Sequence, residues 1–260
     1  MMKRLMACVA ACCLLGASVC HSEDLRVVFV AGPDSHGYGA HDFPGGCRYL
    51  ARCLNEAGLG IHAAVIEGGW PEDPESLNGA DALIVYSDGL QKHILGKEQV
   101  PVIDALRARG VGVGFLHYAC CVEKDGLGPD MLRWMGGCYE PGWSINPFWT
   151  AEFKDLPSHP VTRGVHPFQI RDEWYYHMRF RGEMKGVSPL LTAVPPEATR
   201  QGKDGPHSGN PHVRARSGMP EHVAWAAVGE YGARGFGLTG LHDYWNLGHP
   251  DLRKLLLNAC

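Results

Sequence analysis

The chain has 260 residues, 45% of them hydrophobic, and a formal net charge of −4, so it is long enough to build one sizeable hydrophobic core. Its lysines and arginines are scattered, and no basic run is present. This distribution argues against nucleic-acid binding and against a basic membrane-surface patch. No apolar run is long enough to predict a transmembrane helix.

The first 22 residues have the pattern of a secretory signal peptide. A short basic region precedes an apolar or small run over Leu5–Val19, and polar residues begin just after Cys20. We therefore expect an exported protein, periplasmic or extracellular, with its folded domain in residues 23–260. A lipid anchor on Cys20 is the less favoured alternative, because a small residue is expected before a lipidated cysteine and Val19 stands there.

Strand-like and helical patterns alternate through the first half of the chain. Apolar, β-prone runs predict strands at 25–32, 61–66, 82–86 and 111–116, and helical spacing predicts helices at 44–57 and 97–109. This alternation predicts an α/β protein with a mainly parallel sheet and right-handed crossovers.

The second half is richer in tryptophan, histidine, proline and glycine. Short strands are expected at 150–153, 168–170, 190–193, 223–228 and 236–239, and helices at 129–135 and 250–259. The stretch 195–220 has no apolar periodicity and is expected to be a long loop, a feature that is often functional. No linker or repeat indicates a second domain.

Several polar side chains follow the ends of predicted strands, where chemistry collects in open α/β sheets. They are His36 and His41 after the first strand, Asp88 after the third, His117 after the fourth and His242 after the last. Histidine suits zinc or a similar divalent metal, so His36, His117 and His242 are the predicted ligands. The alternative is that these histidines are structural, because no compact metal motif such as H-x-x-x-H is present.

Carboxylates and one further histidine are candidates for proton transfer. Glu173 and Asp172 lie beside Trp174, Tyr175 and Tyr176, and partial desolvation there would raise a carboxyl pKa toward neutrality. His177 and Asp88 complete the predicted catalytic set. The alternative interpretation makes Asp172 a cap for backbone amides and Asp88 a turn former.

An aromatic and polar set in the second half suggests a carbohydrate site, because sugar C–H faces stack on rings while sugar hydroxyls need hydrogen bonds. The predicted substrate-binding residues are His41, Trp143, Asn146, Trp149, Tyr175, Arg179, His207 and Trp245. Ordinary core packing by large aromatics is the alternative.

Six of the 10 cysteines lie beyond the signal segment: Cys47, Cys53, Cys120, Cys121, Cys138 and Cys260. Their spacing matches no metal motif, and small buried side chains are favoured over disulfides. A cysteine nucleophile is disfavoured, because a nucleophile elbow needs small neighbours and Tyr118-Ala119-Cys120-Cys121-Val122 lacks the glycines.

Several segments together resemble the ThuA-like (trehalose utilisation) family, within the class I glutamine amidotransferase-like fold. They are S-H-G-Y-G-A-H-D-F (35–43), G-V-G-V-G-F-L-H-Y-A (110–119), G-W-S-I-N-P-F-W-T-A-E-F (142–153), H-P-V-T-R-G-V (159–165), D-E-W-Y-Y-H-M-R-F (172–180), D-G-P-H-S-G-N-P (204–211), H-V-A-W (222–225) and 246–259. The resemblance implies a flavodoxin-like three-layer α/β/α sandwich with a mainly parallel central sheet. It also implies that glutaminase activity is absent, because Leu116-His117 stands where amidotransferases carry their cysteine.

The resemblance further implies a role in sugar metabolism, often on oxidised (3-keto) glycosides, and a metal in some members. Family chains usually continue beyond the L-L-N-A stretch, so a truncation at Cys260 is expected.

We expect a metal-assisted enzyme that hydrolyses, isomerises or epimerises a sugar, keto-sugar or glycoside. A non-catalytic carbohydrate-binding protein is the alternative. No nucleotide cofactor is expected, and the expected partners are a small carbohydrate and, as an open question, further copies of the chain.

Overall fold

A seven-stranded, mainly parallel sheet forms the centre of the molecule. The computed structural model describes residues 24–260, so the predicted signal peptide lies outside the described residues. The strand order is β2 (Ile61–Ile66), β1 (Leu25–Ala31), β3 (Ala82–Tyr86), β4 (Gly112–Leu116), β11 (Arg234–Leu238), β10 (Glu221–Val228) and β9 (Val187–Ala193). The first five strands are parallel, and β10 and β9 add antiparallel pairs. The parallel part has the flavodoxin-like order, which confirms the predicted fold class.

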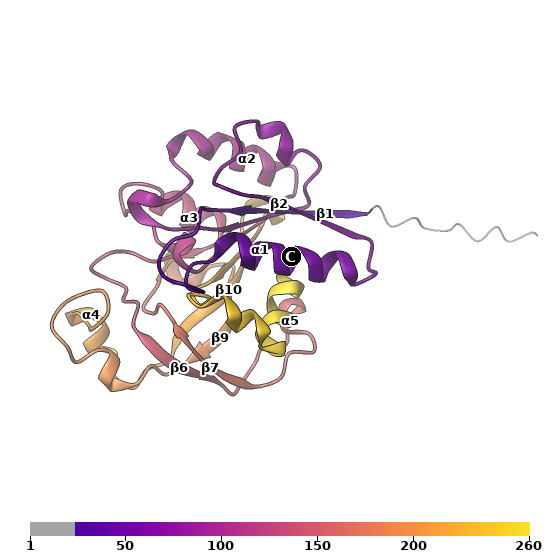
Figure 1. Cartoon of the computed structure of the whole chain (residues 1–260). Helices are drawn as coiled ribbons and strands as arrows, with labels where there is room; N and C mark the ends of the chain where they lie inside the picture. Colours follow the sequence, from indigo (N-terminus) through magenta and orange to yellow (C-terminus); the bar gives the residue numbers. More distant parts are fainter. Residues whose placement is uncertain (1–23) are drawn as a thin grey trace, which may run out of the picture.

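Helices cover both faces of this sheet (Figure 1). On one face lie α1 (Phe43–Glu56) and α5 (Pro250–Ala259), and on the other lie α2 (Val100–Ala108) and α3 (Gly128–Trp134). Strand β1 is buried on both sides: Phe29 packs with the α1 core, whereas Val28 and Val30 pack with the α2 core. The near-continuous apolar run of β1 follows from this double burial.

The second half adds smaller elements around the antiparallel edge. The hairpin of β6 (Phe148–Phe153) and β7 (Phe168–Glu173) packs on the α1/α5 face, and β5 (Gly137–Cys138) pairs with β8 (Arg179–Phe180). The sequence does not predict the two-residue strands, because two residues carry no periodicity. The predicted loop 195–220 is largely irregular, but it contains a short helix, α4 (Pro211–Arg214), which Asn210 caps through Oδ1.

All six cysteines in residues 24–260 are free thiols. Cys47, Cys120, Cys121 and Cys138 are buried, as predicted for small core side chains, and Cys53 and Cys260 are half-buried. Within the same residues, no helix combines the length and apolar character needed to cross a bilayer.

Candidate metal and carbohydrate site

A cavity of about 560 Å³ opens at the carboxyl-terminal edge of the parallel strands. The loops that follow β1, β3, β4 and β11 and the end of β7 bring functional side chains to this edge. The sequence predicts polar residues at successive strand ends, and the parallel topology gathers them at one rim. The cavity therefore lies where doubly wound sheets bind their ligands.

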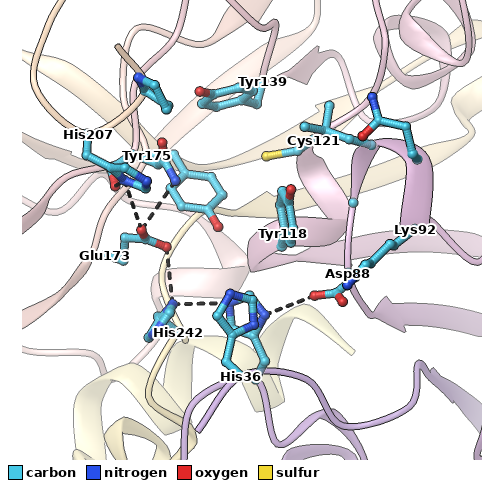
Figure 2. Close-up of a pocket in the computed structure, with 16 residues that line it drawn as sticks. His36, Asp88, Lys92, Tyr118, Cys121, Tyr139, Glu173, Tyr175, His207 and His242 are labelled. Carbon is cyan, nitrogen blue, oxygen red and sulfur yellow. Dashed lines mark hydrogen bonds and ion pairs between the residues drawn. The ribbon is translucent and has the colours of Figure 1, made fainter.

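Four donor atoms converge at the base of the cavity, from His41, His117, Glu173 and His242. His41 Nε2 lies 3.0 Å from His117 Nε2 and 3.1 Å from His242 Nδ1. Glu173 Oε2 lies 3.1 Å from His242 Nδ1 and 3.8 Å from His117 Nε2. Figure 2 shows Glu173 and His207 on one side of the cavity and Asp88 and Lys92 on the other, with His242 and His36 between them.

The hydrogen bonds made by the other ring nitrogens fix the tautomers of His41 and His117. His117 Nδ1 lies 2.9 Å from the carbonyl oxygen of Thr239, and His41 Nδ1 lies 3.0 Å from Asp88 Oδ1. Both oxygens only accept, so both Nδ1 atoms carry hydrogen and both Nε2 atoms carry lone pairs. Two lone pairs facing each other at 3.0 Å repel, and a cation between them would turn the repulsion into attraction.

Electrostatics keep two of these imidazoles neutral. Burial lowers the pKa of His41 to about 4, against the hydrogen bond that His41 donates to Asp88, which raises it. Burial also lowers the pKa of His117 well below its usual range. Burial opposes charge on His242 as well, but its hydrogen bond to Glu173 and the nearby carboxylate charges together outweigh burial and raise the pKa of His242. Neutral imidazole is the form that binds metals.

A second layer of groups orients the four donors. Ser35 Oγ donates to Asp88 Oδ1 at 2.8 Å, which fixes the carboxylate that holds His41. Asn146 Nδ2 donates to Glu173 Oε1 at 3.2 Å. The hydroxyl of Tyr175 lies 3.1 Å from the ligand atom His117 Nε2 itself, so it stands beside the place that a metal would take. Outer groups of this kind set ligand orientation in metal sites.

The backbone around the cavity is strained. His36, His41, His117 and Leu241 have φ values of 69°, 50°, 53° and 82°, in the left-handed region that non-glycine residues rarely adopt. His117 directly follows β4 and begins the turn His117–Cys120, so it occupies a strained strand-to-helix elbow. Such strain concentrates at functional sites.

Eight of the predicted site residues line the cavity: His36, His41, Asp88, Asn146, Glu173, Tyr175, His207 and His242. His117 is fully buried behind them, and its Nε2 is one of the four candidate metal-ligand atoms. His36 is exposed at the mouth and belongs to a second possible donor group with His41 and Asp88, in which Ser35 Oγ contacts all three side chains.

Asp172 lies behind the cavity wall, fully buried. It accepts hydrogen bonds from Asn246 Nδ2 and from the backbone amides of Leu241, His242 and Glu173. Burial raises its pKa to about 6, against these hydrogen bonds, which lower it. Its contacts are those of a group that positions the His242 loop.

The other predicted residues also lie outside the cavity. Trp143 stacks on His177, with ring centroids 4.4 Å apart, and Arg179 lies 3.4 Å above the same indole while pairing with Glu140. Trp149 is a core residue whose Nε1 donates to the carbonyl of Trp174. Trp245 is half-exposed and packs against Gly39.

The structure adds cavity residues that the sequence did not single out for a site role, among them Lys92, Tyr118, Cys121 and Tyr139. Tyr118 could have been found, because it directly follows His117 at the strand end. Burial raises the pKa of Cys121 well above its usual range and also raises that of Cys120, the opposite of what an activated thiol nucleophile needs.

The strand order and the left-handed residue that follows β4 define a flavodoxin-like α/β fold whose site lies at the carboxyl-terminal edge of the sheet. The family model described as ThuA, trehalose utilisation, matches residues 26–260, and the chain belongs to this family. The family's description ties it to carbohydrate use. No curated protein matches the chain.

Solved structures agree with this fold. A ThuA-like protein from Bacteroides uniformis ATCC 8492 is 16% identical with a TM-score of 0.65, and the match covers 94% of this chain and 93% of that one. A ThuA-like protein from Parabacteroides merdae ATCC 43184 is 13% identical with a TM-score of 0.58, covering 91% and 88%. PurLQS from Thermotoga maritima is 13% identical with a TM-score of 0.51, covering 91% and 97%. At these identities the likeness concerns the fold alone.

Proposed function

We propose that the protein is an exported, metal-dependent enzyme that acts on a sugar, keto-sugar or glycoside by hydrolysis, isomerisation or epimerisation. The observation that carries the proposal is the pair of lone-pair nitrogens, His41 Nε2 and His117 Nε2, at 3.0 Å. The family description supports a carbohydrate substrate. The predicted signal pattern supports export.

The donor set fits zinc or a similar divalent ion. Three imidazoles and one carboxylate are an ordinary ligand set, and ligands at about 2.0–2.1 Å from a tetrahedral ion lie roughly 3.3 Å apart. Four of the six separations between these ligand atoms run from 3.0 to 3.8 Å, around that value, and all six lie within 4.8 Å. A metal that accepts a fifth ligand beside these four would, when bound, polarise a carbonyl or hydroxyl oxygen of the sugar.

The chain's own residues would bind and orient the sugar and move protons. Burial raises the pKa of Tyr118 to about 12, so its hydroxyl stays protonated and can donate to a sugar oxygen. Lys92 offers a further donor at the mouth. Glu173 Oε1 lies 3.6 Å from Nδ1 of the largely exposed His207, and this pair would carry a proton between cavity and solvent.

Metal analysis of the purified protein tests the proposal. After incubation with zinc, manganese, nickel or iron and desalting, we expect about one metal ion per chain, and less than a tenth of that in His117→Ala. The matched control is His166→Ala, an exposed histidine that pairs with Asp251. Absence of metal in the wild type under all four conditions would refute the metal assignment.

Turnover is tested separately. NMR on a panel of sugars, 3-keto-sugars and glycosides should show conversion that chelation stops and metal restores. A protein that binds metal and sugars yet converts none of them would instead be the carbohydrate-binding alternative.

A further inference from the structure

A second cavity, of about 1010 Å³, opens at the opposite edge of the sheet from the candidate site. It is bordered by the last turns of α2 and α3, by the loop between β8 and β9, and by the loop between β10 and β11. The parallel strands β4 and β11 begin at this edge, whereas the candidate site lies where they end. None of the predicted site residues, all of which belong to the described part of the chain, lines this second cavity.

Positive side chains outnumber negative ones in the lining of the second cavity. The four basic residues are Arg107, Arg133, Arg181 and Lys185, and the two acidic ones are Asp104 and Glu230. Asp104 already pairs with Arg133, which also pairs with Asp130 outside the lining. The charges of Arg107, Arg181 and Lys185 are therefore opposed in the lining by Glu230 alone, in a chain whose formal net charge is −4.

Two of the arginines donate to neutral groups. Arg107 donates to the backbone carbonyls of Arg133, Trp134 and Arg234, and Arg181 donates to three carbonyls in its own loop and at the end of β10. Within residues 24–260, neither guanidinium lies within 4 Å of a carboxylate. A guanidinium has five N–H groups, so each of these two keeps two of them for a ligand.

The positive charges in this cavity also act on one another. Arg107 is buried, with 8% of its surface exposed, and burial together with the nearby charges of Arg133 and Arg181 lowers its pKa. Like charges that are held close together raise the free energy of the folded protein. An anion bound between them would lower this free energy.

The loop that carries Arg181 and Lys185 has a strained backbone. Glu183 and Met184 have φ values of 52° and 54°, in the left-handed region that non-glycine residues rarely adopt. Gly186 has a φ of 66°, and a Cβ there would lie 2.5 Å from the carbonyl oxygen of Val228, so only glycine lets the loop pack this closely on the end of β10. Such strain concentrates at functional sites, and here it lies in the loop that brings Arg181 and Lys185 to the cavity.

The geometry points to a binding site in this second cavity for a phosphate or sulfate group, with Arg107, Arg181 and Lys185 as its contacts. Guanidinium forks match the oxygens of such anions, and lysine adds a point charge. The cavity is much larger than a free phosphate ion, so it leaves room beside Val228 for the organic part of a phosphate or sulfate ester. The site is independent of the proposed function, because it shares no residue with the metal and carbohydrate cavity.

Calorimetry on the purified protein tests the site, with inorganic phosphate, sulfate and glycerol 3-phosphate as probes. We expect saturable binding of about one glycerol 3-phosphate per chain, roughly threefold or more tighter than that of phosphate. Lys185→Gln should weaken binding about five- to tenfold because it removes a positive charge, and Glu230→Gln should strengthen binding about two- to threefold because it removes the opposing charge. The control is Lys154→Gln, which removes an exposed lysine that pairs with Glu152 just after β6, and it should bind as the wild type does.

The probes distinguish the two sources of the anionic group. Tighter binding of glycerol 3-phosphate than of phosphate supports the site and assigns it to an organic ester, whereas equal affinity supports the site and assigns it to the free ion.

Three results would overturn the inference and leave the proposed function standing. The first is that no probe binds at concentrations up to about 10 mM. The second is binding that Lys185→Gln and Glu230→Gln both leave unchanged. The third is binding that disappears in His117→Ala, which would place the anion at the candidate metal site instead.

Discussion

Asp172 holds the loop of His242 in place through the backbone. Its two carboxylate oxygens accept the amides of Leu241 at 2.8 Å and His242 at 2.9 Å. Leu241 adopts the left-handed conformation with a φ of 82°, so the chain reverses just before His242. Two backbone hydrogen bonds to a buried charge stabilise this strained turn, and they set the position from which His242 reaches the donor group.

Replacing Asp172 by asparagine should therefore weaken metal binding and lower stability without removing a metal ligand. An amide nitrogen would face one of the backbone N–H groups, leaving a buried donor unpaired at a cost of about 1–3 kcal/mol in the free energy of unfolding. Metal affinity should fall roughly tenfold, as for other outer-layer groups. Urea unfolding and metal titration check both. Asp243→Asn, in the same loop, is the control, and equal behaviour of the two variants would contradict the assignment.

Removing the metal should lower thermal stability. A ligand that binds only the folded state at 100 times its Kd adds about 2.7 kcal/mol, and for a chain of this size each kcal/mol is about 2–4 °C in Tm. We therefore expect a chelator to lower the Tm by roughly 5–10 °C, and added zinc to restore it. His117→Ala should show a low Tm that neither treatment moves. A chelator effect of the same size in that variant would place the metal elsewhere.

Asp88→Asn should affect the tautomer of His41. Asp88 only accepts, so it keeps hydrogen on Nδ1 and leaves Nε2 free to bind a metal, whereas an amide could donate to Nδ1 and move the hydrogen to Nε2. We expect metal affinity to fall about 10- to 100-fold with little change in unfolding free energy. Competition with a chromogenic chelator measures the affinity. Asp34 is exposed and directly precedes Ser35, so Asp34→Asn is the control and should keep the metal affinity of the wild type.

The sequence predicts the site's location better than the roles within it. Parallel strands end at one edge, so His117, His242 and Asp88 can be grouped from their positions after predicted strands. Asp172 and Glu173 are consecutive in β7, and consecutive strand side chains point to opposite faces, so one of them has to face away from the cavity. Whether Asp172 or Glu173 faces the cavity depends on how the β6–β7 hairpin packs against the rest of the fold, and this tertiary packing cannot be read from the sequence pattern.

His36 and His41 show the same limit. Both lie in the loop after β1, and the sequence predicts His36 as a ligand and His41 as a substrate group. In the structure His41, and not His36, is one of the four candidate metal ligands. Both residues have left-handed backbone conformations, with His41 buried and His36 exposed. Spacing does not reveal a left-handed conformation at a non-glycine residue. Likewise, Trp143 and Arg179 contact each other, which composition alone could not distinguish from two residues facing a sugar.

His93 should give the protein an acid-sensitive stability. Its Nε2 donates to the carbonyl of Ala119 and its Nδ1 accepts the amide of Leu95, and burial lowers its pKa to about 4. Unfolded histidine titrates near 6.5, so the unfolded chain takes up a proton between pH 6.5 and 4 that the folded chain refuses. The free energy of unfolding should therefore be fully retained above pH 7 and fall by on the order of 1–3 kcal/mol as the pH drops to 4. In His93→Gln this contribution should vanish, so the free energy of unfolding should depend less steeply on pH than in the wild type.

Urea unfolding at pH 7, 5.5 and 4.5 measures this pH dependence, with the exposed His62→Gln as control. Parallel pH profiles for His93→Gln and the wild type would show that His93 titrates normally in the folded protein.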